Sequence, residues 1–385
     1  MDRKFYVKQQ KKDCCGCSAC MHICPKSAIK MSVDQEGFAY PEIDKDLCVS
    51  CGLCEKVCGN YPCKESGYEQ TYYAVKSKNI KERMRSRSGG IFFCIAKVII
   101  AEGGVVYGAA LDSDMNVRHT RALSVEECIP MQGSKYVESD ITHVFFAIEA
   151  DLKSGKKVLF GGTGCQTAGV KSYVNKKCKT YSDNLLTIDI VCHGVPSPKI
   201  YRDYITFVEK KFGGKVKNLD FRDKKFGWDQ CIESYDINGK ECNLKNYANL
   251  FYSNCFLRPS CGECRFASYN RPSDITIADF WGLNKVMPEF DDNKGVSAVM
   301  INTAAGYDIL KKVTDKIEVV SVNKEICTQP NLHRPTKVPE NRADFWNGYN
   351  TKGFKYVLKK YGKYDILHRI KWKFIDLPKM KNKIM

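Results

Sequence analysis

The sequence lacks an apolar run long enough to cross a bilayer. Its longest run, IFFCIAKVIIA at Ile91–Ala101, is too short for a transmembrane helix and contains Lys97. The opening segment MDRKFYVKQQKKD has no apolar stretch, so no secretory signal is expected. These absences argue against a membrane-spanning or secreted protein and predict a cytoplasmic one. With 385 residues, 43% of them hydrophobic and 27% charged, the chain is expected to form two or three globular domains.

Two binding signatures are also missing. The chain has no GxGxxG fingerprint, so a Rossmann dinucleotide site is not predicted. Lys and Arg (61) exceed Asp and Glu (44), which gives a formal net charge of +17, but no nucleic-acid-binding motif accompanies this surplus. We therefore expect no nucleic-acid partner. An acidic redox partner and an anionic membrane surface are the two other partners that the charge fits.

Cysteine, in contrast, is abundant, with 21 residues. The cytoplasm keeps thiols reduced, so metal binding is favoured over disulfides. Two runs share the spacing C-x2-C-x2-C-x3-C, and the second follows the first by 34 residues: Cys14, Cys17, Cys20 and Cys24, then Cys48, Cys51, Cys54 and Cys58. Zinc sites favour two CxxC pairs separated by a longer loop, whereas this repeat is typical of two 4Fe–4S clusters.

In two-cluster ferredoxins, the fourth cysteine of each run binds the other cluster. This rule assigns one cluster to Cys14, Cys17, Cys20 and Cys58, and the other to Cys24, Cys48, Cys51 and Cys54. Cys15 is left over, and Gly59 stands where the first run has Pro25. Thiol density falls after Cys63, so residues 1–65 are predicted to form the two-cluster domain.

The rest of the chain alternates between helix-like and strand-like patterns, which predicts a larger mixed α/β domain. Helices are expected at 91–101, 141–153 and 199–212, and strands at 104–111, 158–160 and 185–191. Ser88 is predicted to cap the first helix, with Gly89 and Gly90 beside its N-terminus. These glycines would allow a ligand close to the backbone, or simply form a capped helix start.

A glycine-rich turn, GGTGCQ at 161–166, follows a predicted strand and can present backbone N–H groups to an anion. Cys165 in this turn and Cys192 each follow a strand, so both are expected at one edge of the sheet. Cys261 and Cys264 form a CxxC pair, which could be half a zinc site or two buried small residues. The four could instead complete a third cluster, with Cys255 as a rival ligand. Ordinary thiols are expected at Cys94, Cys128, Cys178, Cys231, Cys242 and Cys327.

Seven ordered motifs resemble one family. They are SGG (88–90), GSKY (133–136), GTGCQ (162–166), CHGVPSP (192–198), FRDK (221–224), SCGEC (260–264) and DITIADFWG (274–282). The sequence between about residues 70 and 320 resembles the beta subunit of coenzyme F420 hydrogenase/dehydrogenase. That family includes coenzyme F420-reducing hydrogenase beta subunits and 7-hydroxymethyl chlorophyll a reductase. The two-cluster domain looks like the fused form of the family.

The resemblance implies a flavin-binding domain in two parts, 66–155 and 156–335, which holds FAD without a Rossmann fingerprint. It implies FAD contacts from three segments, and a flavin-proximal 4Fe–4S cluster on Cys165, Cys192, Cys261 and Cys264. The segments supply Ser88, Gly89, Gly90, Gly133, Ser134, Lys135, Tyr136, Gly161, Gly162, Thr163 and Gln166. Gly164 stands where proline is common in the family.

The function that follows is an iron–sulfur flavoenzyme. Clusters pass single electrons and a flavin also exchanges hydride, so the two together join a ferredoxin-type donor to an organic or deazaflavin substrate such as coenzyme F420. Either direction of electron flow is compatible with the sequence. The alternative is an electron-transfer subunit of a larger complex with no substrate of its own.

Two polar residues are candidates for catalysis. Lys135 could stabilise reduced flavin, or be a solvated turn lysine, and His193 could donate a proton, or bond to neighbouring backbone. Arg271, Asp274 and Asp279 are interpreted as a structural ion-pair network.

The final segment, 336–385, is predicted to be a basic, aromatic tail. From Thr351 onward it has eleven Lys/Arg and two Asp, interleaved with Phe354, Tyr356, Tyr361, Tyr364, Trp372 and Phe374. It could dock an acidic ferredoxin, lie on an anionic membrane, or pack its aromatic side chains on the body as a solvated helical face.

Overall fold

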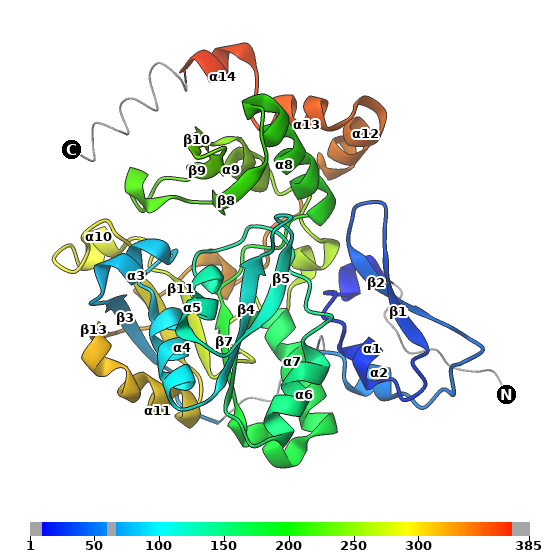
Figure 1. Ribbon diagram of the computed structural model, residues 1–385, viewed down its shortest axis with the longest axis vertical. Coiled ribbons are helices and arrows are strands. Elements are labelled where there is room, and N and C mark those ends of the chain that lie inside the picture. Colours follow the sequence, from blue (N-terminus) through cyan, green and yellow to red (C-terminus); the bar gives the residue numbers. More distant parts are fainter. Residues whose placement is uncertain (1–9, 60–66, 372–385) are drawn as a thin grey trace.

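The computed structural model describes residues 10–59 and 67–371. A small N-terminal domain lies beside a larger mixed α/β body (Figure 1). The small domain holds the antiparallel strands β1 (Ile29–Val33) and β2 (Ala39–Ile43), with the short helices α1 (Ala19–Ile23) and α2 (Leu53–Lys56). Asp34 Oδ1 accepts the backbone N–H groups of Glu36 and Phe38 and so closes the turn between the strands.

An eight-stranded mixed sheet forms the body, in the order β13-β3-β12-β11-β7-β6-β4-β5. The central strands β4, β6, β7 and β11 run parallel, and the flanking strands are antiparallel to their neighbours. The bounds are β3 (Thr71–Ser77), β4 (Val105–Leu111), β5 (Val117–Ala122), β6 (Val158–Thr163), β7 (Leu185–Ile190), β11 (Ile275–Asp279), β12 (Ser297–Ile301) and β13 (Ile317–Val322).

Helices cover both faces of this sheet. Alternate strand residues point to opposite faces, so Val106 and Leu159 pack with α4 (Ile91–Ala101) and α11 (Ala304–Lys312), whereas Tyr107 packs on the other side. That other side is covered by α6 (Phe145–Lys153) and α7 (Gly164–Lys177). The shorter helices α3 (Ile80–Arg85), α5 (Val125–Cys128) and α10 (Leu283–Val286) lie around the sheet (Figure 1).

A second, smaller sheet joins β8 (Val216–Asp220), β9 (Glu233–Ile237) and β10 (Lys240–Leu244) in the order β10-β9-β8. It shares one hydrophobic core with the helices α8 (Pro198–Phe212), α9 (Asn246–Phe251), α12 (Arg342–Lys352) and α13 (Phe354–Tyr361). The last described helix is α14 (Ile366–Lys371). No helix in residues 10–59 or 67–371 has both the length and the apolar character needed to cross a membrane.

The C-terminal helices return to the body. Phe354, Tyr356, Tyr361 and Tyr364 pack against the core of the second sheet, as the structural interpretation of the aromatic tail expects. Trp372 and Phe374 lie outside the described residues. The sequence prediction thus stays untested beyond residue 371.

Most of the expected elements are present. The helix at Ile91–Ala101 and the strands near 104–111 and 185–191 form as predicted. The helix expected from residue 141 begins only at Phe145, and the strand expected at 158–160 extends to Thr163. Strands from 66–155 and from 156–335 share the large sheet, so these two predicted parts are joined by backbone hydrogen bonds.

The prediction that Ser88 caps helix α4 is wrong. The N-cap is Gly90, in the left-handed conformation with φ +87°, and the Ser88 hydroxyl instead donates to the Val296 carbonyl at 2.5 Å. The loop packs so tightly on β12 that its serine bonds across to that strand rather than to the helix.

A buried guanidinium is one of the contacts between the N-terminal domain and the body, where Arg342 also pairs with Glu36. The Arg258 side chain, 1% exposed, donates to the carbonyls of Cys14 (2.9 Å) and Ala39 (2.7 Å) in the small domain. Its third contact is the Glu138 carboxylate of the body, at 2.7 Å. A Cβ at Gly16 would lie 2.7 Å from Arg258 Nη1, so the first cysteine loop needs a glycine there.

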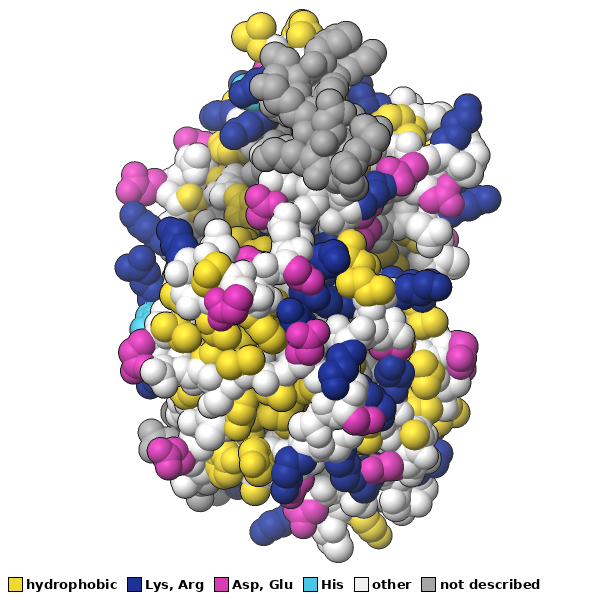
Figure 2. All heavy atoms as spheres, turned by 90° about the vertical axis from the view of Figure 1, so that its left-hand side faces the viewer, with side chains coloured by type: hydrophobic (Ala, Val, Ile, Leu, Met, Phe, Trp, Pro, Cys, Tyr) yellow, Lys and Arg dark blue, Asp and Glu magenta, His cyan; other side chains and the backbone are white. Residues whose placement is uncertain are grey.

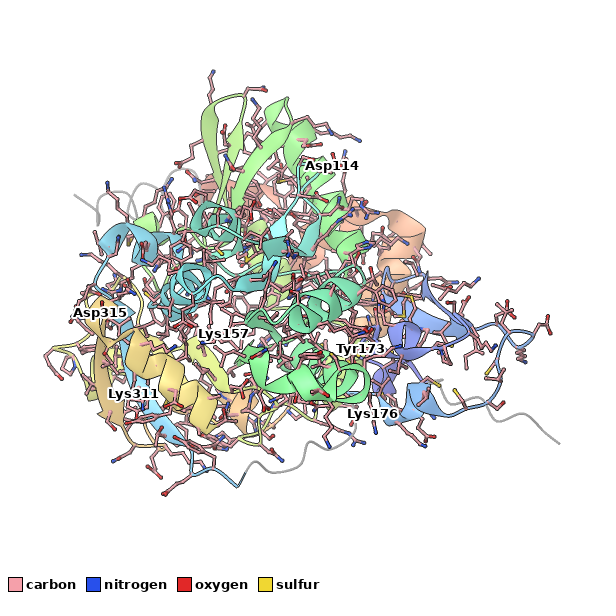
Figure 3. The ribbon with its side chains drawn as sticks, turned by 60° about the horizontal axis from the view of Figure 1, so that its bottom comes forward. Asp114, Lys157, Tyr173, Lys176, Lys311 and Asp315 are labelled. Carbon is pink, nitrogen blue, oxygen red and sulfur yellow. The ribbon has the colours of Figure 1, made fainter. Side chains whose placement is uncertain are left out.

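Helix α7 carries a further contact between the domains. A Cβ at Gly169 would lie 2.8 Å from Cys17 Sγ, and a Cβ at Gly59 would lie 2.6 Å from the Gly169 nitrogen. His22 of α1 stacks on Phe145 of α6, with 4.6 Å between the ring centroids. Tyr173 of α7, which is labelled in Figure 3, lies 6.4 Å from the His22 ring. A proline at position 59 would clash, which explains why the second cysteine run lacks the proline of the first.

Replacing Arg258 by Met is expected to lower the free energy of unfolding by about 3–5 kcal/mol, because the buried Glu138 carboxylate loses its cation. The double variant with Glu138→Gln should lose less than the sum of the two single changes. Denaturant unfolding of anaerobically purified protein measures both. Arg118→Met is the control, since Arg118 is about half exposed in its pair with Asp112 and should cost below about 1 kcal/mol. Equal losses in the Arg258 and Arg118 variants would contradict the prediction.

Candidate functional site

Two cysteines meet at the carboxyl edge of the parallel strands. β6 and β7 pair in register, with Thr163 opposite Ile190, and Cys165 and Cys192 each follow their strand by two residues. Cys261 lies in a 3₁₀ turn at Pro259–Glu263, and Cys264 follows that turn. Cys165 and Cys264 both interact electrostatically with Cys192 and with Cys261. The structure therefore brings together the four thiols that were predicted as one ligand set.

We call Cys165, Cys192, Cys261 and Cys264 the third thiol set. Each sulfur of this set has a hydrogen-bond partner. Thr163 Oγ1 shares a hydrogen bond with Cys165 Sγ (3.2 Å), and Val195 N–H donates to Cys261 Sγ (3.4 Å). The backbone N–H groups of Gly194 and Phe266 donate to Cys192 and Cys264. Such donors stabilise the thiolate form that binds iron.

Burial opposes ionisation of the same thiols. It raises the pKa of Cys192 to about 12 and that of Cys264 to about 11, and the neighbouring Cys165 thiol adds to both shifts. The Arg271 guanidinium acts in the opposite direction on both cysteines. The thiols are thus buried and close to one another, and backbone N–H donors and one cation favour their thiolate form.

Four of the N-terminal cysteines group as the crossed assignment of one cluster requires. Cys24, Cys48, Cys51 and Cys54 line one pocket of the small domain. Burial raises the pKa of Cys20 to about 12, and its neighbouring thiols include Cys14 and Cys58. Within the described residues, no three His, Cys, Asp or Glu side chains are arranged to hold a single metal ion. Cys24 and the first three thiols of the second run thus line one hollow, which suits a cube of iron and sulfur.

Cys15, the thiol left over by the spacing, lies between two of these groups. It hydrogen-bonds to Cys165 of the third thiol set and to Cys17 of the first cysteine run. The rival ligand Cys255 lies elsewhere: its Sγ donates to the Ser253 carbonyl and to Asn341 Oδ1 in the core of the second sheet. The structure places Cys255 apart from the third thiol set.

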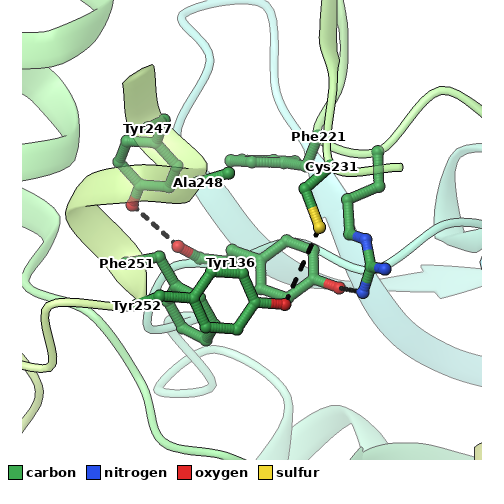
Figure 4. A pocket seen from close by; sticks show the side chains of 8 residues that line it. Tyr136, Phe221, Cys231, Tyr247, Ala248, Phe251 and Tyr252 are labelled. Carbon is green, nitrogen blue, oxygen red and sulfur yellow. Dashed lines mark hydrogen bonds between the residues drawn. The ribbon is translucent and has the colours of Figure 1, made fainter. Parts of the chain in front are cut away.

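An aromatic pocket lies next to the third thiol set. Its lining includes Tyr136, Phe221, Arg222, Cys231, Phe251 and Tyr252 (Figure 4). His193, which follows Cys192 in the chain, packs its ring on Phe251 (5.1 Å) and Tyr252 (6.0 Å). The His193 ring therefore packs on two rings of the pocket and is adjacent in sequence to Cys192. Cys231, expected to be an ordinary thiol, lines this pocket and lies 3.9 Å from the Tyr252 hydroxyl.

One buried arginine, Arg222, lines this pocket, and a second, Arg87, lies across Asp279 from it; sequence reasoning selected neither as a site residue. Arg222 Nη1 donates to the Tyr136 hydroxyl at 3.1 Å, and Arg87 Nη2 donates to the Trp228 carbonyl at 3.0 Å. Both guanidiniums share Asp279 Oδ2, at 3.6 Å from Arg222 and 3.3 Å from Arg87. Arg222 belongs to the FRDK motif and Asp279 to the DITIADFWG motif, so these two motifs were the sequence features from which the two residues could have been selected.

The predicted flavin residues at 88–90 are engaged with the protein. Gly89 N–H donates to Ser297 Oγ (2.9 Å), and its carbonyl accepts Ser77 N–H (2.7 Å). A Cβ at Gly89 would lie 2.0 Å from the Val75 carbonyl oxygen, so this glycine permits close packing on β3. The Ser88 carbonyl accepts Lys224 Nζ at 3.0 Å.

The segment 133–136 contributes Tyr136 to the pocket. The Lys135 ammonium folds back on its own loop, where it donates to the carbonyls of Pro130 (2.5 Å) and Gln132 (2.8 Å). Burial lowers the pKa of Lys135 to about 7. Gly133 has φ +75° and Ser134 follows it, so this turn orients Tyr136 toward Arg222.

The segment 161–166 joins strand β6 to helix α7. Thr163 and Gln166 form a capping box at the helix start, and Gln166 Nε2 donates to the Ser139 carbonyl at 3.0 Å. The Gly161 carbonyl contacts His119 Nε2 at 2.8 Å, and a Cβ at Gly162 would lie 2.9 Å from the Phe160 ring. This segment is held rigidly where it presents Cys165.

His193 bonds to a side chain rather than to the neighbouring backbone: its Nε2 lies 2.7 Å from Asn254 Oδ1. Arg271 forms a fully buried ion pair with Asp189 (2.9 Å), and Asp274 accepts Thr187 Oγ1 (2.6 Å). These two contacts are structural. Asp279, in contrast, lies between the two arginines of the pocket.

Comparison with known proteins finds two families along the chain. Residues 13–60 match the 4Fe–4S dicluster domain, and residues 155–325 match the family described as the C terminus of the coenzyme F420 hydrogenase/dehydrogenase beta subunit. No curated protein matches the chain. Among solved structures, one similar chain comes from the F420-reducing NiFe hydrogenase complex of Methanosarcina barkeri; the TM-score is 0.47 and the identity 16%, over 80% of this chain and 94% of that one.

The two family matches lie in one chain and in the expected order. The dicluster match contains both cysteine runs, and the second match contains all four cysteines of the third thiol set. Residues 155–325 are thus similar to the C terminus of the coenzyme F420 hydrogenase/dehydrogenase beta subunit, and with its fused 4Fe–4S dicluster domain the chain is an iron–sulfur electron-transfer protein related to that subunit.

Proposed function

We propose that this chain is an iron–sulfur flavoenzyme that exchanges electrons with a ferredoxin-type carrier and hydride with a small organic or deazaflavin substrate. The observation that carries the proposal is the third thiol set, which lies directly beside an aromatic pocket. When bound, a 4Fe–4S cluster supplies one-electron transfer and FAD supplies hydride transfer. The side chains of the thiol set and the pocket hold and orient those groups.

A third 4Fe–4S cluster fits Cys165, Cys192, Cys261 and Cys264. Four thiols are neighbours, each sulfur accepts or shares a hydrogen bond, and Arg271 lies close to two of them. A cube with four thiolates is anionic, so a nearby cation and N–H donors favour its formation. Ordinary buried cysteines need none of these features.

We propose that the flavin ring binds at the aromatic pocket. Tyr136 lies 5.9 Å from Phe221 and 5.0 Å from Phe251, so the walls are flat side chains of the kind that stack on planar rings. The predicted FAD contacts at 88–90 and 161–166 use their backbone groups within the protein, so we place the flavin ring nearest to Tyr136. This retains the FAD proposal and shifts its main contacts toward segments 133–136 and 221–222.

The position of Cys15 suggests where an electron carrier docks. The first cysteine run contacts Cys165 through Cys15, whereas Cys51 of the second run is exposed. Electron transfer weakens steeply with distance, so a carrier that approaches Cys51 is best placed to use the second run first. Its docking surface is therefore proposed to be on the far side of the small domain from the pocket.

His193 is proposed to donate a proton to the substrate. Its ring packs on two side chains of the pocket, and Asn254 fixes its orientation at Nε2. A positioned acid contributes about 10²–10⁴-fold to a proton-coupled step. Lys135 has its ammonium turned to its own loop, so we propose a positioning role for it through Tyr136.

Anaerobically purified protein is expected to contain about twelve irons and one FAD per chain, that is, three cubes of four irons. Cys192→Ala should lose about four irons and slow the reduction of the flavin by ferredoxin. Cys255→Ala, which changes a buried thiol outside the set, should keep all the iron. About eight irons without flavin in wild-type protein, after reconstitution, would leave an electron-relay subunit.

Paired variants test the crossed assignment of the N-terminal ligands. Cys24→Ala combined with Cys48→Ala should remove one cluster, about four irons, because both residues line one pocket. Cys24→Ala combined with Cys14→Ala should remove about eight irons, because two clusters are damaged. Iron analysis and electron paramagnetic resonance spectra measure the losses, with Cys15→Ala as the control that keeps all iron. The reverse pattern would mean that each run holds its own cluster.

His193→Gln should keep iron and flavin content unchanged but slow the reoxidation of the reduced protein by a quinone at least about tenfold. Stopped-flow absorbance measures the rate, with iron and flavin analysis of the same samples. An unchanged rate would remove His193 from the mechanism.

A further inference from the structure

The two arginines near the pocket have buried charged donors that the protein around them does not satisfy. Their side chains are 8% (Arg87) and 5% (Arg222) exposed, and the two share one carboxylate, Asp279. Four of their nitrogens, Nε and Nη1 of Arg87 and Nε and Nη2 of Arg222, are buried without an acceptor among the described residues. A buried donor that lacks an acceptor is costly, and more so when it is charged.

Nearby lysines do not account for this arrangement. Lys224 satisfies its ammonium with three carbonyls, of Arg83, Ser88 and Lys294. Lys135 bonds to its own loop. Among Arg87, Arg222, Lys135 and Lys224, only the two arginines have buried charged donors without an acceptor in the described residues. Such donors favour the binding of an anion.

Aromatic rings flank the same pair. The Arg87 guanidinium lies 5.3 Å from the Trp228 ring and that of Arg222 lies 5.7 Å from the Trp281 ring, and the two tryptophan rings are 5.1 Å apart. Trp281 is 45% exposed, so this side of the site is open. Cationic donors between flat rings match a ligand that has both an anionic group and a planar ring.

The site lies on a face that has basic side chains near its middle. Arg87 follows α3 by two residues, and Trp281 precedes α10 by two. Figure 2 shows Lys and Arg side chains near the middle of the face on which α3 and α10 lie, with Asp and Glu side chains among them. The buried arginine pair, rather than the charge of this surface, is therefore what distinguishes the site.

We infer that Arg87 and Arg222 bind the phosphate or carboxylate group of a ring-bearing ligand at the aromatic pocket. The inference deepens the proposed function, since that anion belongs either to the flavin or to the substrate. Asp279 holds the two guanidiniums together and competes with the ligand for them. Arg222 lines the pocket itself, and Arg87 lies across Asp279 from it.

Calorimetric titration of the iron-loaded chain with inorganic pyrophosphate tests the inference. Wild-type protein should bind pyrophosphate, and Arg87→Gln or Arg222→Gln should each weaken binding about tenfold or more, the usual effect of losing a charged hydrogen bond. Arg85→Gln, an exposed residue two positions from Arg87, is the matched control and should change nothing. Asp279→Asn should tighten binding, an effect that misfolding cannot imitate.

The FAD content of the arginine variants distinguishes the two sources of the anion, the flavin and the substrate. If both arginine variants lose FAD and pyrophosphate competes with FAD, the bound group is the flavin diphosphate. If FAD stays bound and the FAD-loaded chain still binds pyrophosphate through the arginines, the bound group belongs to the substrate. A chain without flavin that binds pyrophosphate in this way would overturn the proposed function but support the anion site. Equal pyrophosphate binding by wild type and both arginine variants, with equal FAD content, would overturn the inference.

Discussion

The buried Arg258 guanidinium fixes how the first cysteine run lies against the body. It donates to two carbonyls of the small domain and to one carboxylate of the body, so three segments distant in sequence meet at one side chain. One of the carbonyls belongs to Cys14, and the next residue, Cys15, contacts Cys165. Because a buried cation tolerates little displacement from its acceptors, the first cysteine run is held at a fixed position against the body.

Glycines make this close contact sterically possible. Gly16 leaves room for Arg258, and Gly59 and Gly169 let the second cysteine run and helix α7 touch backbone to backbone. The cost is a departure from strict repetition, since Pro25 has no counterpart at position 59. A ferredoxin-type repeat that is free in solution would have no such requirement. The departure at Gly59 is therefore a consequence of fusion to the body, and it could not be interpreted without the structure.

The sequence predicted the parts of the site that depend on local spacing. Because Cys165 and Cys192 each follow a predicted strand, the sequence indicated that both would lie at one edge of the sheet. The two strands, β6 and β7, pair in register there. The arginine pair was not predicted, because Arg87, Arg222 and Asp279 come from three distant segments and meet only in the folded chain. The Ser88 cap failed for the same reason, since its hydroxyl bonds to Val296, about two hundred residues away.

A common electrostatic principle explains the two sides of the site. Four thiolates around an iron–sulfur cube carry net negative charge, and the body places Arg271 beside the third thiol set and Arg258 beside Cys14. Each of these arginines also has a carboxylate partner, Asp189 and Glu138. Arg87 and Arg222 share the Asp279 carboxylate and still have four buried nitrogens without an acceptor among the described residues. On the inference above, the arginines beside the thiols have their anions within the protein, whereas this pair receives part of its acceptors from a ligand.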